Sequence, residues 1–294
     1  MRANLAALCL AAIAGAGVCY GQSAPATPIA TTLQPVYTRV YCSGFLRDTK
    51  VPDDLYVVSG EQVGYKVLWA QRENVYLNRG SDHGVKVGDR FMVVRRTEDP
   101  DPIEWFKGQT RIAKAMGVLY SDIGQLQVVS VLPKTSVAEV IFSCDYVQRG
   151  DIARPFEERP APPFKEAGTT FDHFAPVSGK PVGTVVTSAL TFQQSQGQGM
   201  TVYVNLGAAQ GVKVGDYLRL FRYQGKLIET VPQTKGYAYQ VYGFGSSPAR
   251  YEWKDLPREV LGEGIVLNAS RNAATIFVTF SSSEIFPGDN VEIE

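Results

Sequence analysis

The chain has 294 residues, and its 29 lysine and arginine residues balance 29 aspartate and glutamate residues. A neutral chain of which 45% is apolar is neither a strongly basic nucleic-acid binder nor a mainly disordered or polytopic membrane protein. At about 150 residues per domain, the length predicts two domains. Glycine, tyrosine and phenylalanine are frequent and long Ala/Leu/Glu/Lys stretches are missing, which favours β structure.

The start of the chain has the pattern of a secretory signal peptide. Met1 to Asn4 carry one positive charge, and an apolar run dominated by alanine and leucine follows from Leu5 to Tyr20. This run is shorter than the roughly 20 residues that a membrane-spanning helix needs. We therefore expect export with residues 1–21 as the signal peptide, cleaved after Gly21 or alternatively after Ala26.

Two alternatives to cleavage stay open. One is an uncleaved anchor helix, and the other is a lipid anchor on Cys19, although Val18 precedes it where such sites prefer Gly, Ala or Ser. Loss of residues 1–21 would leave 28 basic residues, 29 acidic residues and two cysteines. Two cysteines in an oxidising compartment predict a Cys42–Cys144 disulfide, with two buried free thiols as the alternative.

The most informative pattern is an internal repeat. Residues 75–96 and 202–223 align without a gap at an offset of 127, with 11 identities in 22 positions. A second block pairs Glu104, Trp105, Arg111 and Gly117 with Glu252, Trp253, Arg258 and Gly264. A third block pairs Phe142, Ser143, Val147, Gly150 and Asp151 with Phe280, Ser281, Ile285, Gly288 and Asp289. Three blocks in the same order indicate a tandem duplication.

Each copy predicts short strands separated by tight turns. The runs Val75–Leu77 and Val202–Val204 indicate strands, and Asn-x-Gly follows each of them. We expect the Asn-x-Gly residues Asn78, Gly80, Asn205 and Gly207 to provide the positive φ of a tight turn. We expect the turn aspartates to accept bonds from backbone amides, which is a structural rather than a catalytic role. We also expect both valines of each Gly-Val-Lys-Val-Gly-Asp to lie near the core. The turn residues are Asn78, Gly80, Gly84, Gly88, Asp89, Asn205, Gly207, Gly211, Gly215, Asp216, Gly150, Asp151, Gly288 and Asp289.

The sequence therefore predicts an all-β protein of two tandem small β-barrel or sandwich modules joined by a Pro-rich linker. A flexible leader at residues 22–40 precedes module 1 at 41–153. The linker covers residues 154–178, and module 2 follows at 179–294. Module 2 contains an aromatic insertion at 224–251, which has no counterpart of the same length in module 1.

Two smaller features complete the structural prediction. Helical periodicity is weak, apart from a short turn near Pro257–Leu261. Trp105 and Trp253 recur at equivalent places and predict a shared core anchor, whereas Trp69 is unrepeated and its place is less defined.

The repeat also resembles known bacterial modules. The pattern V-x-[VIL]-N-x-G-x(3)-G-V-K-x-G-D with a closing G-D-x-[VI] turn looks like the small β-barrel domain at the C-terminus of flagellar assembly protein T. It is also similar to the envelope domain that follows LysM modules in some Gram-negative proteins. The resemblance implies an exported, non-catalytic β module used in envelope or appendage assembly.

Residues with catalytic or metal-binding chemistry are few. Ser81-Asp82-His83 has the residue types of a hydrolytic triad, but adjacent residues on one turn cannot converge as a triad requires. His173 lies in the linker without the spaced partners of a zinc site. The acidic loop of Glu98, Asp99 and Asp101 favours a solvated turn over a loose cation site. We expect no catalytic residue, no metal and no cofactor.

The candidate binding residues are the aromatic side chains of the insertion. Aromatic rings among glycines can stack on sugars or contact a partner chain, while the alternative is an extra hairpin that packs its own rings. These residues are Tyr237, Tyr239, Tyr242, Phe244 and Tyr251. The expected function is a structural or protein-binding component of the periplasm, outer membrane or cell surface, with envelope or appendage proteins as partners and no nucleic acid. A cell-wall glycan binder is the alternative, and an envelope hydrolase is less favoured.

Overall fold

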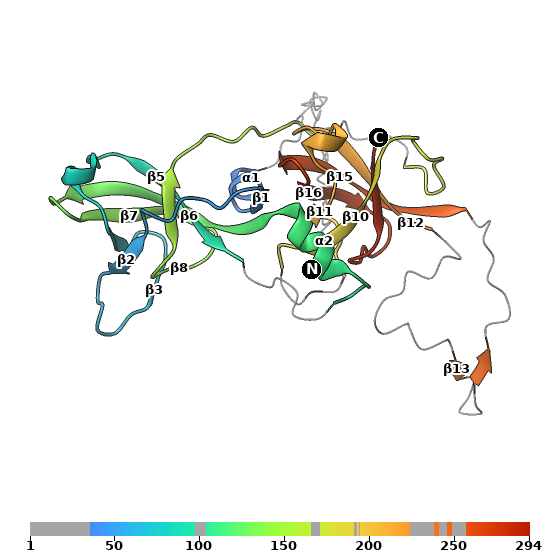
Figure 1. Cartoon of the computed structure of the whole chain (residues 1–294), viewed down its shortest axis with the longest axis horizontal. Helices are drawn as coiled ribbons and strands as arrows, with labels where there is room; N and C mark the ends of the chain where they lie inside the picture. Colours follow the sequence, from blue (N-terminus) through green and yellow to red (C-terminus); the bar gives the residue numbers. More distant parts are fainter. Residues whose placement is uncertain are drawn as a thin grey trace, which may run out of the picture. The chain divides into compact units, whose positions relative to one another are not determined.

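The computed structural model describes residues 36–97, 104–165, 171–190, 193, 195–223, 238–240, 246–248 and 257–294. Along the chain, their strands form a curled sheet, here the first sheet, and then a closed barrel, here the second barrel (Figure 1). This confirms the prediction of an all-β protein with two tandem barrel-like modules. All of the described residues belong to a single unit. None of the helices within them is long and apolar enough to cross a membrane.

The first sheet has the strand order β2-β4-β7-β6-β5-β9, with β1 paired beside β6. Its strands are β1 (Phe45–Arg47), β2 (Val57–Gly60), β4 (Asn74–Leu77), β5 (Arg90–Arg96), β6 (Val118–Val131), β7 (Ser136–Ser143) and β9 (Ile152–Pro155). A bridge between Tyr56 and Ile152 brings the two ends of the sheet together. Outside the sheet lie the paired β3 (Leu68–Trp69) and β8 (Val147–Gln148), and the helices α1 (Tyr37–Tyr41), η1 (Ser81–His83) and α2 (Gln109–Met116).

The second barrel closes in the order β10-β11-β16-β15-β12-β17. Its strands are β10 (Val182–Ser188), β11 (Thr201–Val204), β12 (Tyr217–Tyr223), β15 (Arg258–Ala269), β16 (Ala274–Ser281) and β17 (Asn290–Ile293), and η2 (Ala208–Gln210) follows β11. The chain between β12 and β15 includes a small pair of strands, β13 (Ala238–Gln240) and β14 (Ser246–Pro248).

The strands of the two halves match one for one. By chain order and pairing, β2, β4, β5, β6, β7 and β9 correspond to β10, β11, β12, β15, β16 and β17. The pairing of β2 with β4 is irregular after Val57, and that of β10 with β11 is irregular at the equivalent point after Val185. The duplication therefore extends to the positions of the bulges.

The strand register corrects the second sequence block. Gly124 pairs with Ser143 as Gly262 pairs with Ser281, so Gly124 and Gly262 are the equivalent positions. A Cβ on either glycine would lie 2.4 Å from a carbonyl oxygen of the neighbouring strand, which explains why both are glycine. The prediction that matched Gly117 with Gly264 was wrong, because Gly117 ends α2 and Gly264 lies inside β15.

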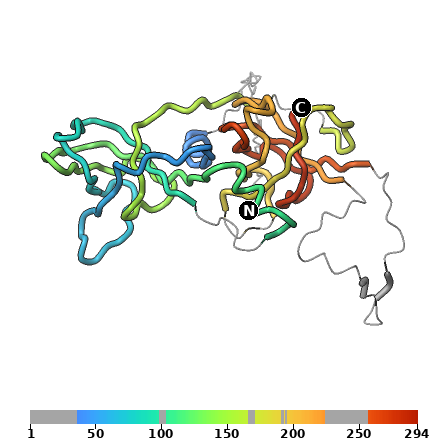
Figure 2. Tube along the Cα trace, in the orientation of Figure 1, coloured from blue at the N-terminus to red at the C-terminus, as the bar shows by residue number. Residues whose placement is uncertain are grey.

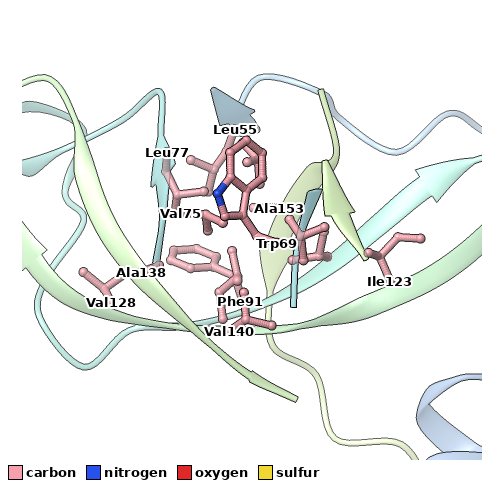
Figure 3. Packing of buried hydrophobic residues seen from close by; sticks show 14 of the residues in the cluster. Leu55, Trp69, Val75, Leu77, Phe91, Ile123, Val128, Ala138, Val140 and Ala153 are labelled. Carbon is pink, nitrogen blue, oxygen red and sulfur yellow. The ribbon is translucent and has the colours of Figure 1, made fainter. Parts of the chain in front are cut away.

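The core of the first sheet contains the tryptophan that has no counterpart in the repeat. The Trp69 side chain is fully buried with Leu55, Val75 and Leu77, and Figure 3 shows its ring beside these residues. Its indole N–H donates to the carbonyl of Glu61 at 3.0 Å, so burial leaves no unpaired donor. Trp105 was predicted to be a core anchor, but it is only partly buried. Its proposed counterpart Trp253 lies outside the described residues.

Three further local predictions differ from the structure. The segment near Pro257–Leu261 is the start of β15 and not a helical turn, because it pairs with β12. The unpredicted helix α2 fills the connection between β5 and β6. Helix α1 begins inside the segment assigned to the flexible leader, residues 22–40, and ends at the first residue of module 1; its Val40 and Tyr41 are buried.

The proline-rich linker contacts both halves of the fold. After β9 the chain runs on as an extended trace (Figure 2). Phe156 stacks on Tyr41 with ring centroids 5.8 Å apart, and Phe164 stacks on Phe277 of β16 at 5.9 Å. Apolar and aromatic side chains placed between the prolines therefore anchor this linker, which composition alone would not indicate.

Candidate functional site

The closing Gly-Asp turns carry a buried ion pair that occurs once in each half. Arg95 on β5 contacts both carboxylate oxygens of Asp151, through Nε at 2.8 Å and Nη2 at 2.9 Å. Arg222 on β12 contacts Asp289 in the same way, with both distances 2.7 Å. Both carboxylates are 1% exposed. Each pair ties a closing turn to a central strand, which is a structural role.

Burial and pairing act in opposite directions on these groups. Burial raises the pKa of Asp151 and Asp289, and the facing guanidiniums counter that rise. Although burial disfavours a charged guanidinium, the carboxylates hold the pKa of Arg95 and Arg222 above the ordinary value, so both arginines stay cationic. Each carboxylate accepts hydrogen bonds from an arginine and from a backbone amide, so each pair cross-links a turn to a strand. Such a pair is here called a staple.

The aspartates of the first turn of each repeat bind only backbone. Asp89 accepts from the Lys86 amide and Asp216 from the Lys213 amide, both at 2.8 Å. Asn78 and Asn205 likewise accept from backbone amides, of Tyr56 at 2.9 Å and of Thr184 at 2.6 Å. These hydrogen bonds hold the loops in place and so help to keep the neighbouring strands in register.

Two of the turn predictions need correction. Most of the turn glycines have positive φ, namely Gly84, Gly88, Gly150, Gly211, Gly215 and Gly288. Gly80 and Gly207 do not, with φ of −133° and −140°. A Cβ on Gly80 would lie 1.9 Å from the Leu132 carbonyl oxygen, so close approach of the backbone, and not φ, requires glycine there.

The two valines of each Gly-Val-Lys-Val-Gly-Asp loop also differ from the prediction. Val85 and Val212 are buried, as expected, whereas Val87 and Val214 are exposed. The loop turns between the two valines, so only the first side chain reaches the core. The second valine is exposed in both halves, more so at Val87 than at Val214.

The most extensive site that the structure assembles is the contact between the two halves, here called the seam. On one side lie residues of the α1–β1 segment and of α2 and β6. On the other lie residues of β10, β11 and β16 and of the turn before β16. Its members are Ser43, Gly44, Leu46, Gln109, Met116, Leu119, Val186, Tyr203, Ala273 and Thr275. Six of them, Leu46, Met116, Leu119, Val186, Tyr203 and Ala273, form one buried apolar cluster.

Hydrogen bonds between described residues also cross the seam. The Tyr203 hydroxyl donates to the Ser43 carbonyl at 2.8 Å, and the Thr275 hydroxyl donates to the Gly44 carbonyl at 3.3 Å. The Gln109 side chain donates to the Val186 carbonyl at 2.8 Å. Burial raises the pKa of Tyr203 far above its ordinary value, so its hydroxyl remains a donor at any physiological pH.

A disulfide and an ion pair hold the α1–β1 segment on which the seam depends. Cys42 and Cys144 are bonded, with Cα atoms 5.5 Å apart, which confirms the predicted disulfide. Arg159 of the linker makes a bidentate pair with Asp122 of β6, both distances being 2.7 Å, and also donates to the Val40 carbonyl at 3.2 Å. The Gly44 amide donates to the same Asp122 carboxylate at 2.9 Å. Burial raises the pKa of Asp122, and the Arg159 charge counters it.

A cleft of about 510 Å³ opens beside the seam. Its walls include three arginines, Arg47, Arg154 and Arg159, and three carboxylates, Asp48, Glu157 and Glu158. The charges balance, and Arg159 is already engaged by Asp122. The lining is thus mixed, with charges of both signs beside apolar side chains such as Phe45 and Leu46, and it indicates no ligand class.

The predicted chemical candidates stay separate in the structure. Ser81, Asp82 and His83 form η1 with exposed side chains, so they share a surface turn and not a catalytic centre. His173 faces Glu259 at 3.3 Å. Across the described residues, no three His, Cys, Asp or Glu side chains are grouped as metal ligands would be. Glu98, Asp99 and Asp101 lie outside the described residues.

The aromatic candidates of the insertion fall almost entirely outside the described part of the chain. Tyr237, Tyr242, Phe244 and Tyr251 lie outside it, and Tyr239 is described only as a backbone position in β13. Their role in binding stays a prediction.

Comparisons with known proteins add no identity: no family model matches the chain, and no curated protein matches it. The candidate site therefore rests on geometry alone. Sequence reasoning missed the seam, because its apolar cluster consists of residue types found in any core and its polar members are scattered along the chain. The one signal in the sequence is Gly44, which lies outside the three repeated blocks.

Proposed function

We propose that the protein is an exported, non-catalytic structural or protein-binding component of a bacterial cell envelope. The observation that carries the proposal is the disulfide between Cys42 and Cys144, which links α1 to the end of β7. Disulfides persist in oxidising compartments such as the periplasm and cell surface, and they are rare in the cytosol. The signal-peptide pattern of residues 1–21 supports the same compartment.

The hydrogen bonding of the buried carboxylates supports a structural role. The buried carboxylates Asp122, Asp151 and Asp289 are each bonded to an arginine and to backbone amides. A catalytic carboxylate needs a free face toward a substrate and a pKa suited to proton transfer. These three instead connect loops, linker and strands, as expected in a module whose task is to present a stable surface.

Export is tested by expressing the chain with its own start in a Gram-negative host and fractionating the cells. We expect the intact mass of the recovered protein to begin after Gly21 or Ala26 and to be two hydrogens lighter than the dithiol. An additional lipid mass on Cys19 would still indicate export. An unprocessed cytoplasmic chain with two free thiols would contradict the proposal.

Partner binding is tested by crosslinking the mature protein in its native envelope, with and without residues 231–250. A deletion of residues 98–103, in the corresponding connection of the first half, is the matched control. We expect a protein partner that is lost only with the first deletion. Retention on purified cell walls that is lost in Tyr239→Ala/Tyr242→Ala would favour the glycan alternative, and turnover of an envelope substrate would favour the hydrolase.

A further inference from the structure

The receiving face of the seam in the second barrel has an equivalent in the first sheet. Tyr203 pairs with Thr275, and in the first sheet Tyr76 pairs with Val137 at the equivalent register. Val186 follows Val185 at the bulge of β10, and Val58 follows Val57 at the bulge of β2. The equivalent of the receiving face therefore consists of Val58, Tyr76 and Val137, here called the acceptor face.

The two faces differ in their burial. Val186 is 0% exposed and Tyr203 is 2% exposed, because the α1–β1 segment and α2 cover them. Val58 is 43% exposed, and Tyr76 and Val137 are only partly buried. Within the described residues, the acceptor face thus keeps the apolar character of a docking surface without the cover that its counterpart has.

The covering element also has an equivalent, on the second barrel. Residues 171–177 precede β10 and bond to the start of β15, where the His173 carbonyl accepts from the Val260 amide at 2.8 Å. The segment with Gly44 and β1 likewise precedes β2 and pairs with the start of β6, so we take residues 171–177 as its counterpart. Ala175 packs on Phe221 and Val260, as Phe45 packs on Val94 and Tyr120. The neighbouring side chains Phe174 and Val177 are 61% and 58% exposed, and they form what is here called the donor segment.

We propose that the chain associates head to tail, with the donor segment of one copy docked on the acceptor face of a second copy. Within one chain the seam already joins a covering segment to a receiving face. Each chain then has one further face and one further segment of the same origin. The segment exposes Phe174 and Val177, and the face is partly exposed, mainly at Val58. Two different complementary surfaces on one molecule give a heterologous contact, which propagates as an open chain unless its rotation closes a ring. This inference rests on the duplication and does not depend on the proposed envelope function.

The proposed contact between two copies cannot reproduce every hydrogen bond of the seam. Phe174 takes the place of Gly44, where a Cβ would lie 2.3 Å from the Tyr203 hydroxyl. A ring at this position excludes a Tyr76 bond that reproduces the one from Tyr203 to Ser43. The contact between copies is therefore apolar packing of Phe174 against Val58 and Tyr76, with a looser fit than the seam and an association that depends on concentration.

The test is sedimentation velocity of the mature chain, residues 22–294, over a wide range of protein concentration. We expect the weight-average mass to rise through dimer to larger species. Val58→Asp and Phe174→Asp should each weaken association by about tenfold or more, because a carboxylate in an apolar contact loses its hydration. Val87→Asp is the matched control, since Val87 and its counterpart Val214 are both exposed and belong to neither surface.

Mixing the two weakened variants gives the sharpest result. The Val58→Asp chain keeps a donor segment and the Phe174→Asp chain keeps an acceptor face, so the mixture should form a one-to-one dimer that grows no further. A monomer at every concentration would overturn the proposal, as would association that both variants leave unchanged. A symmetric dimer that the mixture does not restore would also overturn it.

Association that begins only after removal of residues 22–35 would show that the leader occupies the acceptor face, and would overturn the second copy as its occupant. Thermal unfolding of each variant separates lost folding from lost association.

Discussion

The hydroxyl of Tyr203 in the second barrel donates a hydrogen bond of 2.8 Å to the carbonyl of Ser43, which precedes β1 of the first sheet. The bond is buried and joins residues 160 positions apart in the chain. Its counterpart position, Tyr76, is a tyrosine that is only partly buried. The same residue type thus has two environments in the duplicated fold, and the difference is the covering segment. This makes the covering segment the natural place to test the seam.

Gly44→Ala should weaken the seam. The new Cβ would lie 2.3 Å from the Tyr203 hydroxyl, and alanine is also strained at the φ of +67° that Gly44 adopts. We expect the free energy of unfolding to fall by about 1–3 kcal/mol, as for other overpacked cores. Urea denaturation measures the change.

Tyr203→Phe tests the same contact from the other side. Alone, it should cost about 1 kcal/mol, because the Ser43 carbonyl loses its donor. Combined with Gly44→Ala, it removes the clashing oxygen, so the double variant should be more stable than the sum of the two single changes predicts. Strict additivity would show that the cost of Gly44→Ala does not come from the contact with the Tyr203 hydroxyl.

Asp151→Ala and Asp289→Ala should have similar costs in the two halves. Each change leaves the bidentate donors of Arg95 or Arg222 without their carboxylate. The carboxylates are buried, but the arginines are 29% exposed, so we expect about 2–3 kcal/mol, at or below the lower end of the range for fully buried pairs.

The controls for these aspartates are Asp89→Ala and Asp216→Ala. Their carboxylates bind one backbone amide each and lie at exposed or partly exposed turns. A lost hydrogen bond of this kind costs about 1 kcal/mol. Equal losses at Asp89 and Asp151 in thermal or urea unfolding would contradict the assignment of the buried pairs as staples.

Cys42→Ser/Cys144→Ser should destabilise the fold strongly. The disulfide spans 102 residues, and in the chain-entropy model a closed loop of that length contributes about 4–5 kcal/mol by restricting the unfolded chain. Dithiothreitol should lower the melting temperature of the native protein to that of the double variant and leave the variant itself unaffected. A melting temperature that does not respond to reductant would contradict this prediction.

The parts of the fold that local chemistry determines were predictable from the sequence. Strand runs, glycine turns and the aspartates that accept backbone amides recur in both copies, and a repeat makes such signals visible twice. The predicted cleavage after Gly21 would leave only Cys42 and Cys144, and so only one intramolecular pairing. These features depend on residues that lie close in sequence, or on a small number of alternatives.

The parts that depend on long-range packing were not predictable. The partners of Arg159 and Tyr203 are Asp122 and Ser43, and nothing in the local pattern distinguishes these four residues from solvated or core positions. Alignment by residue type matched Gly117 with Gly264. That match is wrong because the pairing of β6 with β7, and of β15 with β16, makes Gly124 and Gly262 equivalent. Trp69 became the core tryptophan because β3 pairs with β8 and brings its ring over the sheet.

Glu292→Gln should change how stability depends on pH. Although burial opposes ionisation of Glu292, the hydrogen bond from Arg258 at 2.7 Å and the Ser178 amide outweigh it, so its pKa lies below the ordinary value. A lowered pKa in the folded state stabilises the protein above the unfolded-state pKa of about 4.3, and this contribution is lost as the pH falls through the folded-state pKa. The native chain should therefore exceed the variant in free energy of unfolding at neutral pH, and the difference should shrink as the pH falls below about 4. Urea unfolding of both proteins between neutral and acidic pH measures the difference. A gap that is constant, or that widens toward acid, would show that the Arg258–Glu292 pair does not favour the ionised carboxylate.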